Sequence, residues 1–248
     1  MAVTSMTELW HEIVGAQADP PHAVVLGAGA VALVAVAPRP VWRLTRNAVT
    51  IAHEGGHALV ALCTGRRLSG IRLHADTSGV TVSYGKPRGP GMVLTALAGY
   101  VAPALLGLGG AALLGAGHIT ALLWACVALL ALMLLMIRNV FGGLTLLATG
   151  AAVFLVTWYA TSQVQAAFAD FAVWFLLFGG VRPVFELQWQ RARGRAPQSD
   201  ADQLATLTGV PGLAWVLLFG VVALGAAVLG AHWLVPHWTT TVSSLPRR

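Results

Sequence analysis

Two histidines and a glutamate stand close together in the segment His53-Glu54-Gly55-Gly56-His57. On a helix, residues four apart lie on the same face about one turn apart, so His53 and His57 can point ring nitrogens at one metal ion. Zinc held by two imidazoles and a carboxylate keeps a fourth position for water, lowers the pKa of that water, and polarises a substrate carbonyl. Glu54, beside the metal, could take the water's proton and return it to a leaving amine. The spacing therefore predicts zinc-dependent hydrolysis.

A zinc site of this kind needs a third protein ligand, and the acidic candidates after the motif are Asp76, Asp170, Glu186, Asp200 and Asp202. Asp170 lies inside an apolar run, where an intramembrane ligand is expected. Asp200 and Asp202 open a short helical pattern after a basic segment. Asp200, with Gln203 three residues later, fits a helix capping box equally well. Position in the chain separates these candidates only partly, and the residues alone leave the third ligand open.

The elements that must position these groups are apolar. Hydrophobic residues make up 57% of the 248-residue chain and charged residues 10%, with a mean hydropathy of +0.74. A soluble domain has about 25% charged residues. Several apolar runs approach the ~20 residues that cross a bilayer. We therefore expect a multi-pass integral membrane protein, surrounded by the lipid bilayer.

The distribution of charge and the probability of an accidental match both affect how the zinc motif is interpreted. The net charge of +6 comes from basic residues between the apolar runs, a pattern that suits membrane orientation and not nucleic-acid binding. Glu54 is the one glutamate of the central apolar region, and an ionisable group at membrane depth is costly unless it is paired or functional. The same spacing arises by chance in roughly 1% of chains of this length. An accidental match is therefore a poor explanation.

The apolar pattern predicts an all-α polytopic membrane fold with six to seven transmembrane helices, in a single domain over residues 23–235. A polar tail over 1–22 precedes this domain and a tail over 236–248 follows it.

Three segments of the domain concern the motif directly. The zinc motif is expected on a helix over 41–64, and alternating apolar and polar residues predict a β-hairpin over 68–85. A basic loop is expected over 182–202. The basic clusters fall on one side of the membrane only if the motif helix or the hairpin enters it without crossing. A re-entrant element is therefore a hypothesis.

The motif helix, the hairpin and the later spans together resemble the site-2 protease family of intramembrane zinc metallopeptidases, peptidase family M50. The compact bacterial M50B-like branch is the most similar. Further segments resemble signatures of that branch: Gly70-Ile71-Arg72-Leu73, Ser78-Gly79-Val80-Thr81, Ala98-Gly99-Tyr100 with Pro103, Arg138-Asn139, and Ser199-Asp200-Ala201. The Leu-Asp-Gly segment and the PDZ-like insertion of better-known members are missing from the sequence.

This resemblance implies Zn²⁺ as cofactor and Asp200 as the third ligand, ahead of Asp170 and Asp202. It also implies cleavage of a membrane-protein substrate in or near a transmembrane segment, as in regulated intramembrane proteolysis. The bacterial plasma membrane is the location that it implies.

Three residues outside the zinc motif are expected to touch substrate. Asn139 could donate a hydrogen bond to the oxyanion, or it could cap a helix end. One edge of the hairpin could pair with an unwound substrate strand, or the hairpin could instead shield the site from water. Thr81 and Ser83 are the residues expected on that edge, and Arg72 and His74 if the other edge is used.

Two functions remain open at this point. The first is a zinc-dependent intramembrane endopeptidase. The second is a non-catalytic membrane scaffold or transporter that retains a structural metal site. The enzyme requires Glu54, whereas a metal-held scaffold would tolerate Glu54→Gln.

Overall fold

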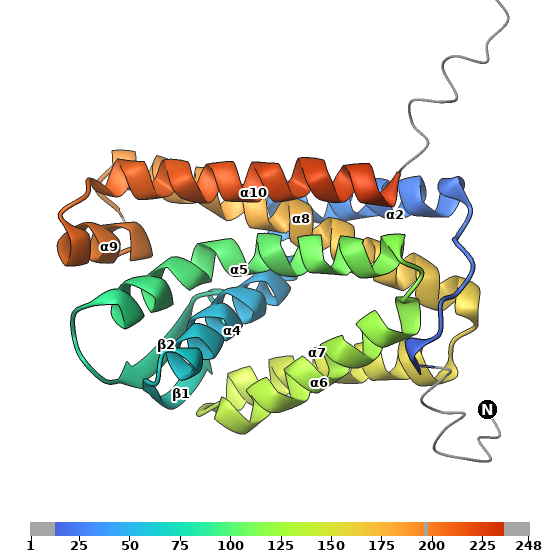
Figure 1. The fold of residues 1–248 in the computed structure, drawn as a ribbon, viewed down its shortest axis with the longest axis horizontal. Helices are drawn as coiled ribbons and strands as arrows, with labels where there is room; N and C mark the ends of the chain where they lie inside the picture. The colour runs from blue at the N-terminus through green and yellow to red at the C-terminus, as the bar shows by residue number, and fades with distance from the viewer. Residues whose placement is uncertain (1–12, 196–197, 236–248) are drawn as a thin grey trace, which may run out of the picture.

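The computed structural model describes residues 13–195 and 198–235 of the chain. These residues form a bundle of helices with one small hairpin (Figure 1). The elements, in chain order, are α2 (His22–Val36), α3 (Arg39–Thr45), α4 (Asn47–Cys63), β1 (Arg67–Leu73), β2 (Gly79–Tyr84), α5 (Pro90–Gly115), α6 (Ile119–Met136), α7 (Val140–Tyr159), α8 (Ser162–Ala192), α9 (Asp200–Thr208) and α10 (Gly212–Leu234).

Helix α5 lies at the centre of the arrangement. It packs against α4 on one side and against α8 and α10 on the other, while α2 packs along α8 (Figure 1). Helices α6 and α7 pair with each other, and α9 contacts α5 and α10. The motif helix is therefore held between the hairpin and the centre of the bundle.

Five helices of the described residues, α5, α6, α7, α8 and α10, are long and apolar enough to cross a membrane. Helices α2 and α3 would add a sixth span if this pair, bent by 98°, is one span. Pro38 and Pro40 explain the bend, because proline cannot donate within a helix. The predicted all-α membrane fold with a hairpin is confirmed, and the number of spans lies at the lower end of the prediction or just below it.

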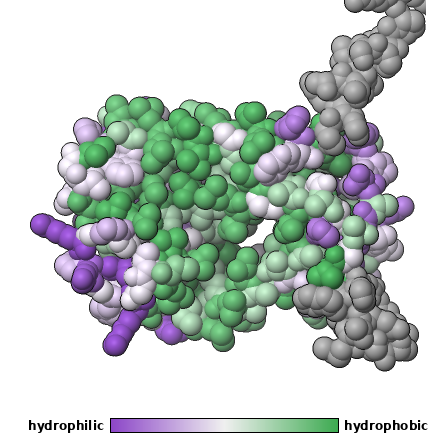
Figure 2. Space-filling model, in the orientation of Figure 1, coloured by the Kyte–Doolittle hydropathy of each residue, from purple (hydrophilic) through white to green (hydrophobic). Residues whose placement is uncertain are grey.

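The surface has the distribution expected of a membrane protein. Figure 2 shows apolar residues over most of the visible face, with the largest group of polar residues at the end where the hairpin and the start of α5 lie in Figure 1, and others at the opposite end. Helix α4, with 17 residues, is not among the helices that could cross by length. Whether it enters the membrane without crossing stays a prediction.

The helix expected over 41–64 is divided in two. Helix α3 ends at Thr45 and α4 begins at Asn47. The Thr45 hydroxyl donates to the carbonyl of Ala35 at 2.8 Å and of Val41 at 3.3 Å, and such bonding of hydroxyls to the backbone bends helices. Helix α4 ends at Cys63, and Gly65, two residues later, adopts φ +73°, a conformation that favours glycine.

The basic loop expected over 182–202 is a second correction. Helix α8 continues to Ala192, and only the segment up to Ser199 is irregular in the residues that the structure describes. Arg182 and Glu186, one turn apart, form an ion pair of 2.8 Å that supports the helix where a loop was expected.

Candidate metal centre and active site

Three side chains from two distant segments meet at one point. His53 Nε2 and His57 Nε2 on α4 lie 3.1 Å apart. Asp200 Oδ2, at the start of α9, lies 3.2 Å from the first nitrogen and 3.3 Å from the second. Tetrahedral zinc with bonds of about 2.0–2.1 Å places its ligand atoms about 3.3 Å apart. The three atoms thus have the spacing of a zinc site and form a group that could hold a metal ion.

The chemistry of these atoms also fits a cation. Asp200 Oδ2 is buried and makes no hydrogen bond with any residue that the structure describes. Burial would raise the pKa of Asp200, but the adjacent imidazoles of His53 and His57 outweigh burial and hold that pKa well below its usual range. A charged carboxylate oxygen and two ring nitrogens therefore converge where a positive charge would be stabilised.

Helix α5 leaves room for this group at Gly99. A Cβ atom added there would lie 2.6 Å from His53 Nε2 and still closer to His57 Nε2. Both distances are shorter than any ordinary contact, so a side chain at this position would occupy the place of the metal ligands. Gly56 allows the close approach of the two helices, because its own Cβ would lie 2.9 Å from the Ala98 carbonyl oxygen.

The two imidazoles are oriented by different partners on α5. His57 Nδ1 lies 2.6 Å from the carbonyl oxygen of Thr95. A proton on Nδ1 donates to that carbonyl and leaves Nε2 free to bind a metal, which is the usual arrangement of a ligating histidine. The ring of Tyr100 meets the ring of His53 edge to face, with centroids 4.9 Å apart.

Asp200 owes its position to the start of α9. Ser199 caps this helix by accepting from the Asp202 backbone N–H at 3.4 Å. The capping box suggested for Asp200 and Gln203 is therefore wrong by one residue, and Asp200 is the first residue of the helix. Arg191, near the end of α8, donates to Ser199 Oγ at 3.2 Å and forms an ion pair with Asp202.

The two reserve aspartates lie elsewhere. Asp202 is engaged by Arg191 and by the Ser199 hydroxyl, which donates to its Oδ2 at 2.7 Å. Asp170 is buried within α8. Within the described residues, the grouping that could hold a metal contains Asp200 and neither of these two.

Glu54 is held by the hairpin. It is 4% exposed, and its Oε2 accepts a hydrogen bond of 2.6 Å from the Thr81 hydroxyl on β2. Gly79 lies against the same carboxyl group, since a Cβ there would lie 2.6 Å from Glu54 Oε1. The hairpin therefore orients one carboxylate oxygen and leaves space beside the other.

The two outer edges of the hairpin differ in how many of their backbone groups are hydrogen-bonded to the rest of the chain. The outward backbone groups of β1 are those of Ile71 and Leu73: Arg138 N donates to Ile71 O at 2.9 Å, and the Asn139 amide bonds both backbone groups of Leu73, at 2.7 and 3.2 Å. Arg72 and His74, suggested for this edge, instead face β2, as His74 N donates to Ser78 O at 2.9 Å.

The alternation along β2 turns the backbone of Thr81 and Ser83 outward, away from β1. Among the described residues, the partner of this edge is Arg66, which approaches Ser83 O at 3.5 Å and donates to Ser83 Oγ at 3.0 Å. Strand pairing at this edge stays a prediction. Asn139 lies at the start of α7 without capping it through its side chain, and its oxyanion role likewise stays a prediction.

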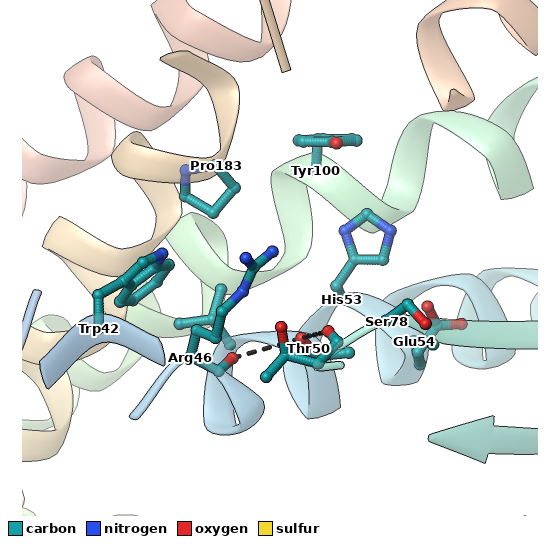
Figure 3. A pocket seen from close by; sticks show the side chains of 11 residues that line it. Trp42, Arg46, Thr50, His53, Glu54, Ser78, Tyr100 and Pro183 are labelled. Atoms are coloured by element: carbon teal, nitrogen blue, oxygen red, sulfur yellow. Dashed lines mark hydrogen bonds between the residues drawn. The ribbon is translucent and has the colours of Figure 1, made fainter. Parts of the chain in front are cut away.

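A cavity of about 180 Å³ opens beside the motif. Its lining includes His53 and Glu54 from α4, Ser78 and Gly79 from the hairpin, and Tyr100 from α5 (Figure 3). The prospective metal ligand and the prospective base thus face one space that could receive substrate.

A comparison with family models gives a match to the peptidase M50B-like family over residues 26–230. The chain belongs to this family. Comparison with curated proteins and with solved structures gave no match. Membership supports the role of an intramembrane metallopeptidase and agrees with the multi-pass membrane architecture. Members of the wider M50 group depend on zinc in general, and the His53, His57 and Asp200 group offers the ligands.

Sequence reasoning did not find every residue of the site. The roles of Thr95 and Arg191 could not be read from the sequence, because a backbone carbonyl and a basic residue carry no metal signature. Gly79 and Gly99 stood in segments quoted only for their resemblance to family signatures. Their physical role, close approach to Glu54 and to the two imidazoles, appears only once the elements are packed.

Proposed function

We propose that this protein is a zinc-dependent intramembrane endopeptidase that hydrolyses peptide bonds in or near the transmembrane segments of other membrane proteins. The observation that carries the proposal is the convergence of His53, His57 and Asp200 at zinc-ligand spacing, with Glu54 next in the chain and facing the same cavity. The bacterial plasma membrane is the location supported by the resemblance to the compact bacterial branch.

Metal binding, proton transfer and orientation of the base are assigned to different residues. His53, His57 and Asp200 would hold the zinc ion, which when bound lowers the pKa of a water molecule and polarises the substrate carbonyl. Glu54 accepts a proton from the attacking water and delivers it to the leaving amine. Thr81 keeps the Glu54 carboxylate in one orientation by donating to Oε2.

The substrate must also be unwound, because a helix hides its own peptide bonds. Unpaired backbone groups at membrane depth are costly, so an extended substrate needs new hydrogen-bond partners. The outward edge of β2, at Thr81 and Ser83, would supply them by strand addition. Its position beside Glu54 supports this role, because Thr81 contacts the carboxylate directly.

The test compares purified wild-type protein with Glu54→Gln, measuring bound zinc and cleavage of peptides that contain a transmembrane segment. Removal of a general base lowers the cleavage rate about a hundred- to ten-thousandfold, while zinc content should stay near one ion per chain. The wild-type protein and Glu54→Gln could instead bind equal amounts of zinc while the wild-type protein cleaves none of a broad set of transmembrane segments. That result would favour a scaffold or transporter with a structural metal.

A further inference from the structure

The cavity has a second end, away from the metal ligands, where α3 meets α4. Trp42 and Arg46 line this end together with Pro183 of α8. Figure 3 shows the Arg46 side chain extending from the start of α4 into the space between Trp42, Pro183 and His53. The same cavity therefore joins a basic, aromatic region to the catalytic motif.

Two donors at this end are poorly satisfied in the part of the chain that the structure describes. Trp42 is only 2% exposed, and its Nε1 has no hydrogen-bond partner in the described part of the chain. A buried donor of this kind is destabilising unless a ligand or water satisfies it. Arg46 Nη1 forms a long ion pair with Glu186 Oε2, at 3.8 Å, which is beyond hydrogen-bond distance. Trp42 Nε1 is thus unpaired within the described residues, and Arg46, which lines the cavity, is held only by a weak contact that a closer acceptor would replace.

The charge of this region favours an anion. Glu186 is engaged more closely by Arg182, whose Nε lies 2.8 Å from Glu186 Oε1. Arg182 and Arg46 both lie near the Trp42 ring, at 5.0 and 5.9 Å from its centroid. Two guanidinium groups thus face one carboxylate, and of these three groups Arg46 is the one that lines the cavity, at the end opposite Glu54.

We propose that Trp42 and Arg46 form a specificity subsite for an acidic side chain, Asp or Glu, of the substrate segment. The inference rests on the proposed protease function. The cavity of about 180 Å³ is smaller than the ~300 Å³ at which sites for drug-sized ligands begin, so it suits side chains of a bound substrate segment and not a separate drug-sized molecule.

The distance from the metal ligands fixes where that acidic residue lies. Arg46 precedes His53 by seven residues, which corresponds to a rise of about 10 Å along a helix. An extended strand covers this distance in about three residues. The acidic side chain is therefore about three residues from the scissile bond.

The experiment uses the full chain, loaded with zinc, in phosphatidylcholine vesicles. Model transmembrane-segment peptides carry a single Asp, Asn or Lys at each position near their cleavage site. At one position, Asp should be cut about tenfold faster than Asn, as expected for one charged hydrogen bond, and Lys should be cut more slowly. Arg46→Gln should abolish this preference, and Arg46→Glu should turn it toward Lys.

Two further variants sharpen the assignment. Arg43→Gln removes the same charge from an exposed position on the neighbouring turn, so it should keep the full preference for Asp. Trp42→Phe keeps an aromatic ring but removes the N–H donor, so it should lose part of the preference. An unchanged preference in Arg46→Gln would overturn the subsite, and so would an equal loss in Arg43→Gln.

Binding to the inactive Glu54→Gln form separates this inference from the proposed function. Preferential binding of Asp peptides that depends on Arg46, without cleavage by the wild type, would support the subsite and refute the protease. Cleavage without any preference that depends on Arg46 would do the reverse. An Arg46 effect seen for all peptides alike, and only in vesicles containing phosphatidylglycerol, would assign the anion to a lipid phosphate and overturn the proposal.

Discussion

Helices α4 and α5 differ from the pair α6 and α7 in how their polar groups are used. Between α4 and α5, side chains bond across the helix interface, as His57 does to the Thr95 carbonyl at 2.6 Å. In α7, the hydroxyls of Thr145 and Thr149 bond back to carbonyls of their own helix, each at 2.8 Å. The first interface contains the chemistry, whereas the second satisfies its hydroxyls locally and exposes apolar side chains.

Glycines show the same difference. Gly56 and Gly99 lie where α4 and α5 meet, and a Cβ at either would collide with the neighbouring helix. Gly143, on α7, has no atom within 4 Å of an added Cβ. Glycines also allow close approach between α5 and α8, where a Cβ at Gly180 would lie 3.0 Å from the backbone of Ala104. Small residues in an apolar helix therefore do not mark a site by themselves.

The largest expected effect breaks the metal group itself. His53→Ala, His57→Ala and Asp200→Ala each remove one of three converging ligands, so bound zinc should fall to background and cleavage with it. Asp170→Ala and Asp202→Ala should keep near-stoichiometric zinc. The measurement is zinc per chain by elemental analysis after gel filtration. Loss of zinc in Asp170→Ala alone would identify the intramembrane aspartate as the ligand.

The second effect concerns the glycine contrast. Gly99→Ala places a methyl group 2.6 Å from His53 Nε2, so zinc content should drop nearly as far as in the histidine variants. Gly143→Ala meets open space and should bind zinc and cleave like the wild type. Equal zinc in both variants would show that α4 and α5 can separate at no cost, and that their close packing does not hold the site.

The sequence was sufficient for the parts of this molecule that are local in the chain. The spacing of His53 and His57 placed two ligands on one helix face, and the alternation in the hairpin segment predicted two strands that the structure contains. The third ligand is not local. Asp200 lies 143 residues beyond His57, and the residues alone left it open beside Asp170 and Asp202.

Other features of the structure were not predicted, one of them local and two of them dependent on tertiary contacts. The continuation of α8 through Arg182 and Glu186 was not predicted, because charged residues also favour loops; the four-residue spacing of this ion pair is local and was the available signal for a helix. The bonding of the Asn139 amide to Leu73 links residues 66 apart, and no local pattern indicates it. The open edge of β2 likewise follows from which strand edge the chain later covers.

The third prediction tests that open edge. Thr81→Pro removes the outward backbone N–H of β2, since proline has no amide hydrogen, but it also removes the hydroxyl that contacts Glu54. Thr81→Val removes the hydroxyl alone and is the matched control. If substrate pairs with this edge, Thr81→Pro should cleave about five- to tenfold more slowly than Thr81→Val, the effect of about one lost hydrogen bond.

Ser83→Pro should reduce cleavage similarly, whereas zinc content should persist in all three variants. The effect of these substitutions on cleavage is measured best with peptide substrates at concentrations below saturation, where kcat/KM reports binding in the transition state. Equal rates in Thr81→Pro and Thr81→Val, together with full activity in Ser83→Pro, would exclude strand addition here. The hairpin would then be a shield for the site.

The smallest expected effect concerns the connection between α8 and α9, which positions Asp200. Arg191 contacts Ser199 and Asp202, but not Asp200, so it positions the ligand without touching the metal. Burial would raise the pKa of Asp202, and its contacts with Ser199 and Arg191 lower it overall, which keeps this partner charged. Removal of such an outer contact typically weakens metal binding about 10- to 100-fold.

Arg191→Gln should therefore weaken zinc binding by about tenfold, at the lower end of that range, because the Ser199 cap still begins α9 at the same residue. Arg195→Gln, at an exposed position beyond the end of α8, is the matched control and should leave zinc affinity unchanged. Competition with a chelator of known zinc affinity measures both. If Arg191 acts through Asp202, then Asp202→Asn weakens zinc to a similar extent, and the double variant is no weaker than either single one. Additive losses would mean that Arg191 and Asp202 stabilise α9 independently, and unchanged affinity would mean that the packing of α9 on α5 and α10 suffices to place Asp200.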